Sequence, residues 1–303
     1  MPGGSAEPWT VLRLLNWTKD YFARAGLDSP RLAAEVLLAH VLECKRIDLY
    51  ARFDHEPEEA RKAAFRDLVR RAAAGEPVAY LVGVKEFYSL SMVVSSDVMI
   101  PRPETEILVS EALDHLKRPE SISRGRPRRL WDVCTGSGCV AVATAVNCPQ
   151  VEVLATDASA EALAVARKNV ERHGLAGRVR CERADLLTAP EGCEAWADVD
   201  VITANPPYVA AEDEIGPEVR AEPPAAVFAG EDGLDVLRPL IAQAPDRLAP
   251  GGSLILEFGR GQADAVRDLI VQARRNGAPA FEEPRILRDH QGIERSAAAM
   301  RRA

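Results

Sequence analysis

Apolar side chains recur at helical spacing over the first eighty residues of this 303-residue chain. The pattern predicts one helix over residues 9–25, a second that opens at Ser29-Pro30, and a third that follows Pro57 and ends near Gly75. Proline suits the first turn of a helix, where an N–H group has no partner within the helix. We therefore expect residues 1–85 to form a small helical domain.

The spacing changes between Glu86 and Ile100, where apolar residues are interrupted by polar breaks at residues 95–97. This pattern predicts a β-hairpin, with residues 86–105 as hairpin and linker. A helix is expected from Glu104 to about residue 116. The next stretch, 117–129, is rich in Pro, Gly, Ser and Arg, and it indicates an exposed connection.

From residue 129 onward, short apolar runs alternate with segments of helical spacing. Helices are predicted at 139–145, 160–173, 232–248 and 262–276. Strands are predicted at 129–133, 151–156, 179–183, 199–203, 253–258, 281–288 and 293–300, the last two as an antiparallel pair. Strand–helix alternation predicts an α/β fold with a doubly wound, mostly parallel sheet of seven strands within residues 106–303.

Composition narrows the class of protein. Hydrophobic residues make up 47% of the chain, enough for a sizeable core, and the formal charge of −8 disfavours a direct nucleic-acid partner. Six dispersed cysteines without C-x-x-C spacing indicate free thiols in a reducing cytosol and no metal site. No signal-peptide pattern and no apolar run of roughly 18 residues is present. We expect a cytoplasmic monomer without membrane association.

A glycine-rich turn, residues 132–138, lies between a predicted strand and a predicted helix. Glycine lets the backbone approach a ligand closely, and a helix N-terminus favours electron-rich groups. Asp157 ends the next strand, about 20 residues later, where a carboxylate can accept both ribose hydroxyls of a nucleoside. Asp185 follows the third strand and could meet an adenine amine. Together these features predict a nucleoside cofactor.

Each of these features also has an ordinary structural explanation. The turn can be a tight strand–helix connection, and the aspartates can be solvated turn residues or helix caps, with Ser159 as a plausible N-cap beside Asp157. The loop carries neither the Lys-Ser/Thr of a P-loop nor the second half of a G-x-G-x-x-G fingerprint. Triphosphate and dinucleotide ligands are therefore disfavoured.

The segment Asn205-Pro206-Pro207-Tyr208 follows the fourth strand, at the edge where such sheets build active sites. Two adjacent prolines remove two N–H groups and stiffen the chain, which leaves the Pro206 carbonyl free as an acceptor. With the Asn205 side-chain carbonyl it can bind both hydrogens of a planar NH2 group, beside the flat wall of Tyr208. The nitrogen lone pair would then face a methyl group on the cofactor. A proline-stiffened turn is the structural alternative.

These motifs resemble those of amino-methyltransferases that act on protein glutamine or on adenine in DNA. The chain more closely resembles the release factor glutamine methyltransferase family, over nearly its whole length. The shared segments are Gly75–Leu81, Glu86–Tyr88, Ile100–Glu106, Val219–Pro223, Gly230–Leu234 and the C-terminal Arg288, Asp289 and Arg295.

The resemblance implies an S-adenosylmethionine-dependent enzyme that methylates the side-chain nitrogen of the glutamine in the Gly-Gly-Gln motif of peptide chain release factors, and so modulates translation termination. The N-terminal helical domain would dock the release factor. The expected cofactor-binding residues are Cys134, Thr135, Gly136, Ser137, Gly138, Asp157, Leu186 and Asn205, to which the strand pattern adds Asp185. The expected catalytic and substrate-binding residues are Asn205, Pro206, Pro207 and Tyr208, with Arg102 as a further substrate-binding residue.

Two positions depart from the family pattern. Cys134 stands where many relatives have the first glycine of the loop, so its backbone is not expected to take a conformation reserved for glycine. Leu186 stands where an aromatic residue can occur, so no ring stacking on adenine is expected from it.

Three other functions stay open. A glutamine methyltransferase of a ribosomal protein is close, although residues 101–104 favour a release factor. A DNA adenine methyltransferase would need base flipping and a basic DNA-reading domain, against the acidic balance and the helical N-terminus. A binding module that has lost turnover is disfavoured by the intact Asn205–Tyr208 segment and Asp157.

Overall fold

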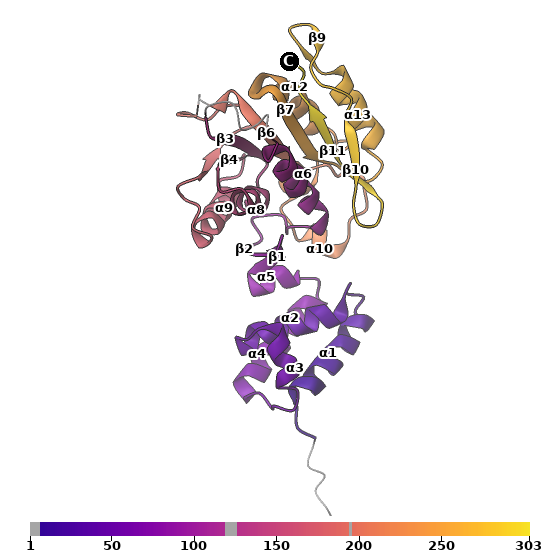
Figure 1. Ribbon diagram of the computed structural model, residues 1–303. Helices are drawn as coiled ribbons and strands as arrows, with labels where there is room; N and C mark the ends of the chain where they lie inside the picture. Colours follow the sequence, from indigo (N-terminus) through magenta and orange to yellow (C-terminus); the bar gives the residue numbers. More distant parts are fainter. Residues whose placement is uncertain (1–6, 119–125, 194–195) are drawn as a thin grey trace, which may run out of the picture. The chain divides into compact units, whose positions relative to one another are not determined.

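The computed structural model describes residues 7–118, 126–193 and 196–303, and the chain forms two compact units, Met1–Gly83 and Val84–Ala303 (Figure 1). Each unit has a hydrophobic core of its own. Most of the predicted exposed connection, residues 119–125, lies outside the described residues.

The N-terminal unit is helical throughout. Its helices are α1 (Val11–Arg24), α2 (Pro30–Leu42), α3 (Arg46–Ala51), α4 (Glu59–Ala73) and α5 (Val78–Val82). The three long helices follow the predicted pattern, whereas the short α3 and α5 were not predicted, because six and five residues hold too few turns for a periodic signal. Phe22, Leu37, Leu49 and Phe65 fill the core at 1% exposure or less.

The second unit opens with a hairpin of β1 (Val84–Phe87) and β2 (Leu90–Val93). The hairpin is shorter than predicted and turns at another place. The chain reverses at Tyr88 and Ser89, both with positive φ, whereas residues 95–97 lie in the loop beyond the hairpin. The prediction erred because neither turn residue is a glycine, asparagine or proline, the usual sequence signals of a tight turn.

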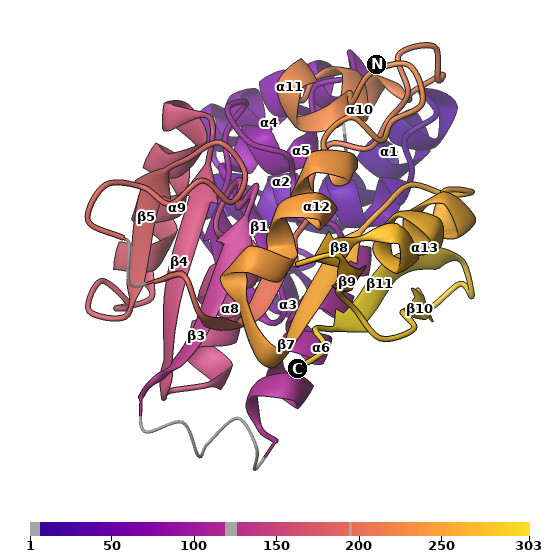
Figure 2. The ribbon, with the colours of Figure 1, turned by 90° about the horizontal axis from the view of Figure 1, so that it is seen from above.

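Seven strands form the main sheet: β3 (Arg128–Val133), β4 (Val151–Asp157), β5 (Val179–Arg183), β6 (Val199–Ala204), β7 (Leu248–Glu257), β10 (Arg285–Arg288) and β11 (Glu294–Met300). Their order is β10-β11-β7-β6-β3-β4-β5 (Figure 2). The strands from β7 to β5 pair in parallel, while β11 is antiparallel to its neighbours β7 and β10. The predicted fold, a doubly wound and mostly parallel seven-stranded sheet, is confirmed.

Helices cover both faces of this sheet. One core contains residues of α6 (Glu106–Leu116), α8 (Cys139–Asn147) and α9 (Ala160–Arg172), and the other contains residues of α12 (Leu237–Arg247) and α13 (Ala263–Gln272). Successive strand residues point to opposite faces, so Leu130 joins the first core and Trp131 the second, both fully buried. Burial on both faces explains the nearly continuous apolar runs of the central strands.

Several short elements were not predicted. They are η1 (Pro103–Thr105), α10 (Pro217–Arg220), α11 (Pro224–Val227) and the two-residue strands β8 (Arg274–Arg275) and β9 (Ala278–Pro279). Helix α12 also begins five residues later than predicted, at Leu237. The preceding loop turns through Gly233, whose φ is +74° and where a Cβ would lie 2.3 Å from the Tyr208 carbonyl oxygen. Only glycine fits this approach, which pulls the loop toward the end of β6.

One buried side chain ties the hairpin to the sheet. Asn169 of α9 is fully buried, accepts a hydrogen bond from Val93 N at 2.7 Å, and donates to Val93 O at 2.9 Å and Ser137 O at 2.8 Å. A single amide therefore satisfies backbone groups of strand β2 and of the glycine-rich turn.

We expect Asn169→Ala to lower the free energy of unfolding by about 2–4 kcal/mol, because three backbone groups would lose their partner in the interior. Urea denaturation monitored by circular dichroism measures the change. The control is Asn147→Ala, an exposed asparagine at the end of α8, which should change stability by less than about 0.5 kcal/mol. Equal stabilities for the two variants would contradict the bridging role of Asn169.

Candidate active site

A cavity of about 540 Å³ opens at the carboxyl ends of strands β3, β4, β5 and β6. The predicted site residues that line it are Cys134, Thr135, Gly136, Ser137, Asp157, Asp185, Leu186, Asn205 and Pro207. They come from four separate segments, so the fold brings together residues as far apart in the sequence as Cys134 and Pro207. Further walls come from the segment around Pro101 and Thr105 and from residues 223–243.

Four predicted residues stand outside the lining of this cavity. Gly138 is the N-cap of helix α8, and Pro206 is buried in the backbone turn. The Tyr208 hydroxyl turns to a buried carboxylate, Glu257. Arg102 donates to Glu222 Oε1 at 2.6 Å, and the same oxygen accepts from Ile100 N at 3.2 Å. In the structure Arg102 thus braces the loop before α6 against Glu222, which is 3% exposed.

The glycine-rich turn is held by backbone contacts on both sides. Thr135 N donates to Thr156 O at 3.0 Å, and Gly138 N donates to Thr135 O at 2.8 Å. Gly136 and Gly138 have φ values of +55° and +77°, and a Cβ at Gly138 would come within 3.2 Å of Ala166. These glycines are required by left-handed backbone and by close packing of α8 on α9.

The expectation for Cys134 is corrected by the structure. Its φ is +54°, in the left-handed region that favours glycine, although the position carries a side chain. An L-residue pays about 1–2 kcal/mol for this conformation. Leu186, on the far side of the cavity, has a φ of +48° and is strained in the same way. Burial raises the pKa of the Cys134 thiol, so it stays protonated at neutral pH.

Asp157 makes two hydrogen bonds to backbone groups. Its Oδ2 accepts from Gly136 N at 2.9 Å and its Oδ1 accepts from Ser159 N at 3.0 Å. Ser159 caps helix α9 by accepting from Ala162 N at 3.0 Å. This is the N-cap role that the sequence suggested for Ser159. Burial raises the pKa of Asp157, and its hydrogen bonds to backbone N–H groups lower the pKa by a smaller amount. Each carboxylate oxygen keeps a second lone pair, so the structural role leaves room for a ligand hydroxyl.

Asp132 is a site residue that the sequence reasoning left out. Its carboxyl is buried behind the turn, accepts from the Thr135 hydroxyl, and accepts from Thr203 Oγ1 at 2.7 Å. Burial raises its pKa to about 6, and the two hydroxyls oppose that rise. A charged residue inside an apolar strand was the available signal, because such a group needs partners where the strand ends.

The Asn205–Tyr208 segment is anchored by a second buried acid. Asn205 Nδ2 donates to Thr105 Oγ1 at 3.2 Å, and Tyr208 Oη donates to Glu257 Oε1 at 3.0 Å. Burial raises the pKa of Glu257 to about 7 and also raises the pKa of Tyr208. Asn205 Oδ1 is buried and has no hydrogen-bond partner among the described residues. Thr105 and Glu257 were likewise missed, since both are far from the motif in sequence.

Gln262 holds the backbone that follows the motif. Its Nε2 donates to Tyr208 O at 2.9 Å, and its Oε1 accepts from Gly259 N at 2.7 Å. The loop after β7 and the loop after β6 are therefore joined by one side chain at the start of α13.

Two negative findings apply to the described parts of the chain. Within residues 7–118, 126–193 and 196–303 no cluster of three or more His, Cys, Asp or Glu side chains could hold a metal ion. None of the helices in those ranges has both the length and the apolar character to cross a bilayer.

The two units of the chain match two different family models. Residues 13–83 match the family model of the PrmC N-terminal domain, and residues 105–222 match that of the methyltransferase small domain. A solved methyltransferase from Pyrococcus furiosus shares the fold, with a TM-score of 0.50 at 17% identity over 81% of this chain and 100% of the other. The chain is an S-adenosylmethionine-dependent methyltransferase.

Full-length relatives define the family. The release factor glutamine methyltransferase of Rhodopirellula baltica is 45% identical, over 95% of both chains. That of Bordetella pertussis is 44% identical, over 91% of this chain and 96% of the other. This chain belongs to the release factor glutamine methyltransferase family, which confirms the resemblance seen in its motifs.

The buried carboxyl of Asp132 predicts a pH dependence of stability. A carboxyl whose pKa rises from 3.8 to about 6 on folding binds its proton more tightly in the folded state. Its contribution to stability is complete below pH 3.8 and is lost as the pH rises through about 6. The free energy of unfolding of the wild type, relative to Asp132→Asn, should therefore fall across pH 4–6 and level off above that range.

Urea denaturation of both proteins at a series of pH values measures this difference. Asp114→Asn, which removes an exposed acid of α6, serves as the control for the loss of one negative charge. Parallel pH curves for wild type and Asp132→Asn would show that Asp132 titrates alike in the folded and unfolded chain.

Proposed function

We propose that this protein transfers a methyl group from S-adenosylmethionine to the side-chain amide nitrogen of the glutamine in the Gly-Gly-Gln motif of peptide chain release factors. The observation that carries the choice of an amide is Asn205 Oδ1, a buried acceptor without a partner among the described residues, in the wall of the cavity. Release factors act in translation termination, so we place the reaction in the cytoplasm, with modulation of termination as its consequence.

The cavity has the size and chemistry for S-adenosylmethionine. Small-molecule sites span about 300–1,000 Å³, and this one measures about 540 Å³. A Cβ on Gly136 would meet no described atom within 4 Å, so the space in front of the turn is open to a ligand. The residues that would hold the cofactor are Cys134, Thr135, Gly136, Ser137, Asp157, Asp185, Leu186 and Asn205. Gly138 would support the turn from outside the lining, as the N-cap of α8.

Each region of the cavity would recognise a different part of this cofactor. Asp157 would accept the ribose hydroxyls with its remaining lone pairs, and Asp185 would accept from the adenine amine. Leu186 would offer an apolar surface to the base. When bound, S-adenosylmethionine supplies a methyl group on a positively charged sulfonium, an electrophile strong enough for a weakly nucleophilic nitrogen.

The chain's own task is then to orient an amide. Asn205 Oδ1 would accept one hydrogen of the substrate NH2 group and the Pro206 carbonyl the other. An amide nitrogen is a poor nucleophile because its lone pair is delocalised. Two fixed acceptors in a site with little water hold the nitrogen in a reactive alignment, and that alignment removes much of the entropic barrier.

We expect Asn205→Ala to lower kcat by about 100- to 1000-fold, the usual loss when one positioned polar group is removed from a reaction site. Purified release factor is incubated with the protein and S-adenosylmethionine, and mass spectrometry measures the gain of one methyl on a glutamine. If Asn205 only accepts a hydrogen bond, Asn205→Asp should retain more activity than Asn205→Ala, because it keeps an acceptor oxygen of the same size.

The same assay separates the other functions. Methylation of ribosomal protein glutamine or of DNA adenine, with release factor unmodified, would replace the proposed substrate. Near-normal rates for both Asn205 variants at saturating cofactor and substrate would exclude Asn205 as the residue that orients the amide.

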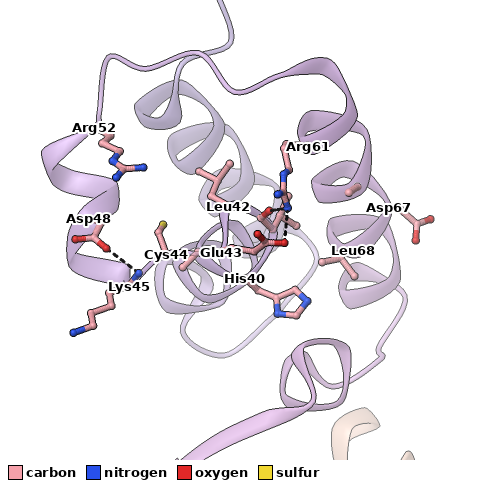
Figure 3. A pocket seen from close by; sticks show the side chains of 13 residues that line it. His40, Leu42, Glu43, Cys44, Lys45, Asp48, Arg52, Arg61, Asp67 and Leu68 are labelled. Atoms are coloured by element: carbon pink, nitrogen blue, oxygen red, sulfur yellow. Dashed lines mark hydrogen bonds and ion pairs between the residues drawn. The ribbon is translucent and has the colours of Figure 1, made fainter.

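We further propose that the N-terminal unit docks the release factor. A hollow of about 910 Å³ lies between α2, α3 and α4, and Lys45, Asp48 and Arg52 of the α3 region line it. Figure 3 shows Arg61 of α4 paired with Glu43, and both residues line this hollow. The ion pair measures 3.1 Å.

Apolar side chains alternate with these charged ones along the same segment. Ile47 and Tyr50 of α3 and Phe53 just beyond its end are 70%, 43% and 53% exposed, whereas Leu49 of the same helix is buried in the core. Aromatic and aliphatic side chains at the centre of a patch, with charged residues around them, are typical of protein interfaces.

The double substitution Ile47→Ser with Phe53→Ser should raise KM for whole release factor by about tenfold, the cost of losing an interface anchor. Its kcat, and its rate on a short Gly-Gly-Gln peptide, should stay unchanged because the cavity is untouched. Steady-state kinetics with both substrates measures this split. Val271→Ser, a 43% exposed apolar residue of α13, is the control. An unchanged KM for the whole factor would exclude this face from docking.

A further inference from the structure

Behind Asn205 lies a short chain of buried polar side chains that comes from three distant segments. Asn205 Nδ2 donates to Thr105 Oγ1 at 3.2 Å. Glu257, at the end of β7, accepts from Tyr208 Oη at 3.0 Å. The hydroxyl of Thr105 lies close enough to this carboxyl to lower its pKa. Thr105 and Glu257 are each 1% exposed. The active-site amide is thus backed by a hydroxyl, and the hydroxyl by an acid.

The direction of each hydrogen bond follows from the donors present. A carboxylate can only accept, so an ionised Glu257 takes the single proton of the Thr105 hydroxyl. Thr105 Oγ1 then has only lone pairs to offer on its other side. The Asn205 group that faces it must be the NH2 end, which leaves Oδ1 turned away from Thr105. That oxygen is the buried acceptor without a partner among the described residues.

We propose that Thr105 and Glu257 are positioning residues that fix the polarity of the Asn205 amide, with its oxygen presented to the substrate nitrogen, and that a proton on Glu257 abolishes this preference. The inference rests on the proposed function, since it assigns a task to Asn205 in amide recognition. An asparagine side chain is nearly symmetric in shape, so packing alone selects its orientation poorly. The carboxylate of Glu257 can only accept, so it fixes the direction of the Thr105 hydroxyl and, through that hydroxyl, the orientation of the Asn205 amide.

Protonation of Glu257 removes the constraint on the orientation of the Asn205 amide. A neutral Glu257 can donate to Thr105 Oγ1, and the Thr105 proton is then free to point at Asn205. The Asn205 amide would then rotate so that Oδ1 accepts the Thr105 proton. Its NH2 group would face the NH2 group of the substrate, and two donors cannot hydrogen-bond to each other. Binding of the substrate amide in a reactive alignment is lost, although no atom of the backbone moves.

The surroundings place this titration near neutrality. Burial raises the pKa of Glu257 to about 7, against hydrogen bonds from Thr105 and Tyr208 that lower it. Among charged neighbours, Glu104 of η1 raises the pKa of Glu257 and Arg295 of β11 lowers it. The Cys139 thiol at the start of α8 also lies within electrostatic reach, and burial keeps it protonated at this pH. Glu257 Oε2 has no partner among the described residues, which leaves it able to take up the proton.

The first test removes the hydroxyl that transmits the orientation. Thr105→Val keeps the shape of the side chain, and kcat with whole release factor should fall about 10- to 100-fold, the effect of a misaligned reacting group. Thr105→Ser restores the hydroxyl and should restore most of the rate. Thr144→Val is the matched control, because Thr144 is fully buried in α8 and its hydroxyl has no partner among the described residues. That variant should react at the wild-type rate.

The second test follows the acid itself. At saturating S-adenosylmethionine and release factor, wild-type kcat should rise through a single step near pH 7 to a plateau. Glu257→Gln cannot ionise, so its kcat should be lower at high pH and should lack that step. In the free protein, infrared difference spectra should show protonated carboxyl bands that grow below pH 7. The band that grows around pH 7 should be absent in Glu257→Gln, which keeps the band of Asp132 around pH 6.

The outcomes separate this inference from the proposed function. If the wild type transfers no methyl group to release factor, the proposed function fails. If the wild type is active but Thr105→Val reacts at its full rate, or Glu257→Gln keeps the pH step, the positioning role is overturned. Should either variant fail to fold, the infrared titration of Asp132→Asn, which lacks the other buried acid that titrates near this range, still decides. A carboxyl band that does not change between pH 6 and 8 in that variant overturns the proposal.

Discussion

A single carboxylate, that of Asp132, joins the two sides of the cavity. It accepts from Thr135 in the glycine-rich turn and from Thr203, two residues before Asn205 on the neighbouring strand. A buried carboxylate is costly unless its oxygens are bound, so the turn and strand β6 cannot separate without leaving that charge unpaired. The loop assigned to the cofactor and the loop assigned to the substrate therefore keep one spacing.

A second acid repeats this arrangement on the other side of strand β6. Glu257 ends β7, beside β6, and it holds Tyr208 as Asp132 holds Thr203. Both acids have raised pKa values, about 6 and about 7, which record that burial acts against their charged forms. Groups perturbed in this way concentrate at functional sites. The apolar cores on the two faces of the sheet supply the stability that offsets them.

Backbone strain gathers at the same place. Cys134 and Leu186 line the cavity with positive φ values, although neither is a glycine, and Gly136 in the same lining also has a positive φ. Left-handed residues reverse the chain within a short distance, which lets three loops converge on one small volume. Strained conformations persist only where the surrounding structure holds them, and here the parallel strands beneath the loops do so.

The sequence by itself determined the fold class, because apolar runs buried on both faces and alternating with amphipathic helices admit few arrangements other than a doubly wound sheet. It also determined which segments supply the cavity, since the turn at residues 132–138, Asp157, Asp185 and Asn205 all follow predicted strands. Short-range rules suffice for these features, as each depends on residues within about one turn of helix or one strand.

The tertiary structure alone decided the residues behind the site. Thr105 lies 100 positions from Asn205, and Glu257 lies 49 positions from Tyr208, so no local pattern links them. It also decided that Arg102 pairs with Glu222 and that Cys134 adopts a left-handed backbone. Hydrogen bonds between buried groups depend on which strands become neighbours and on what each group loses when water is excluded. Those quantities exist only once the chain is folded.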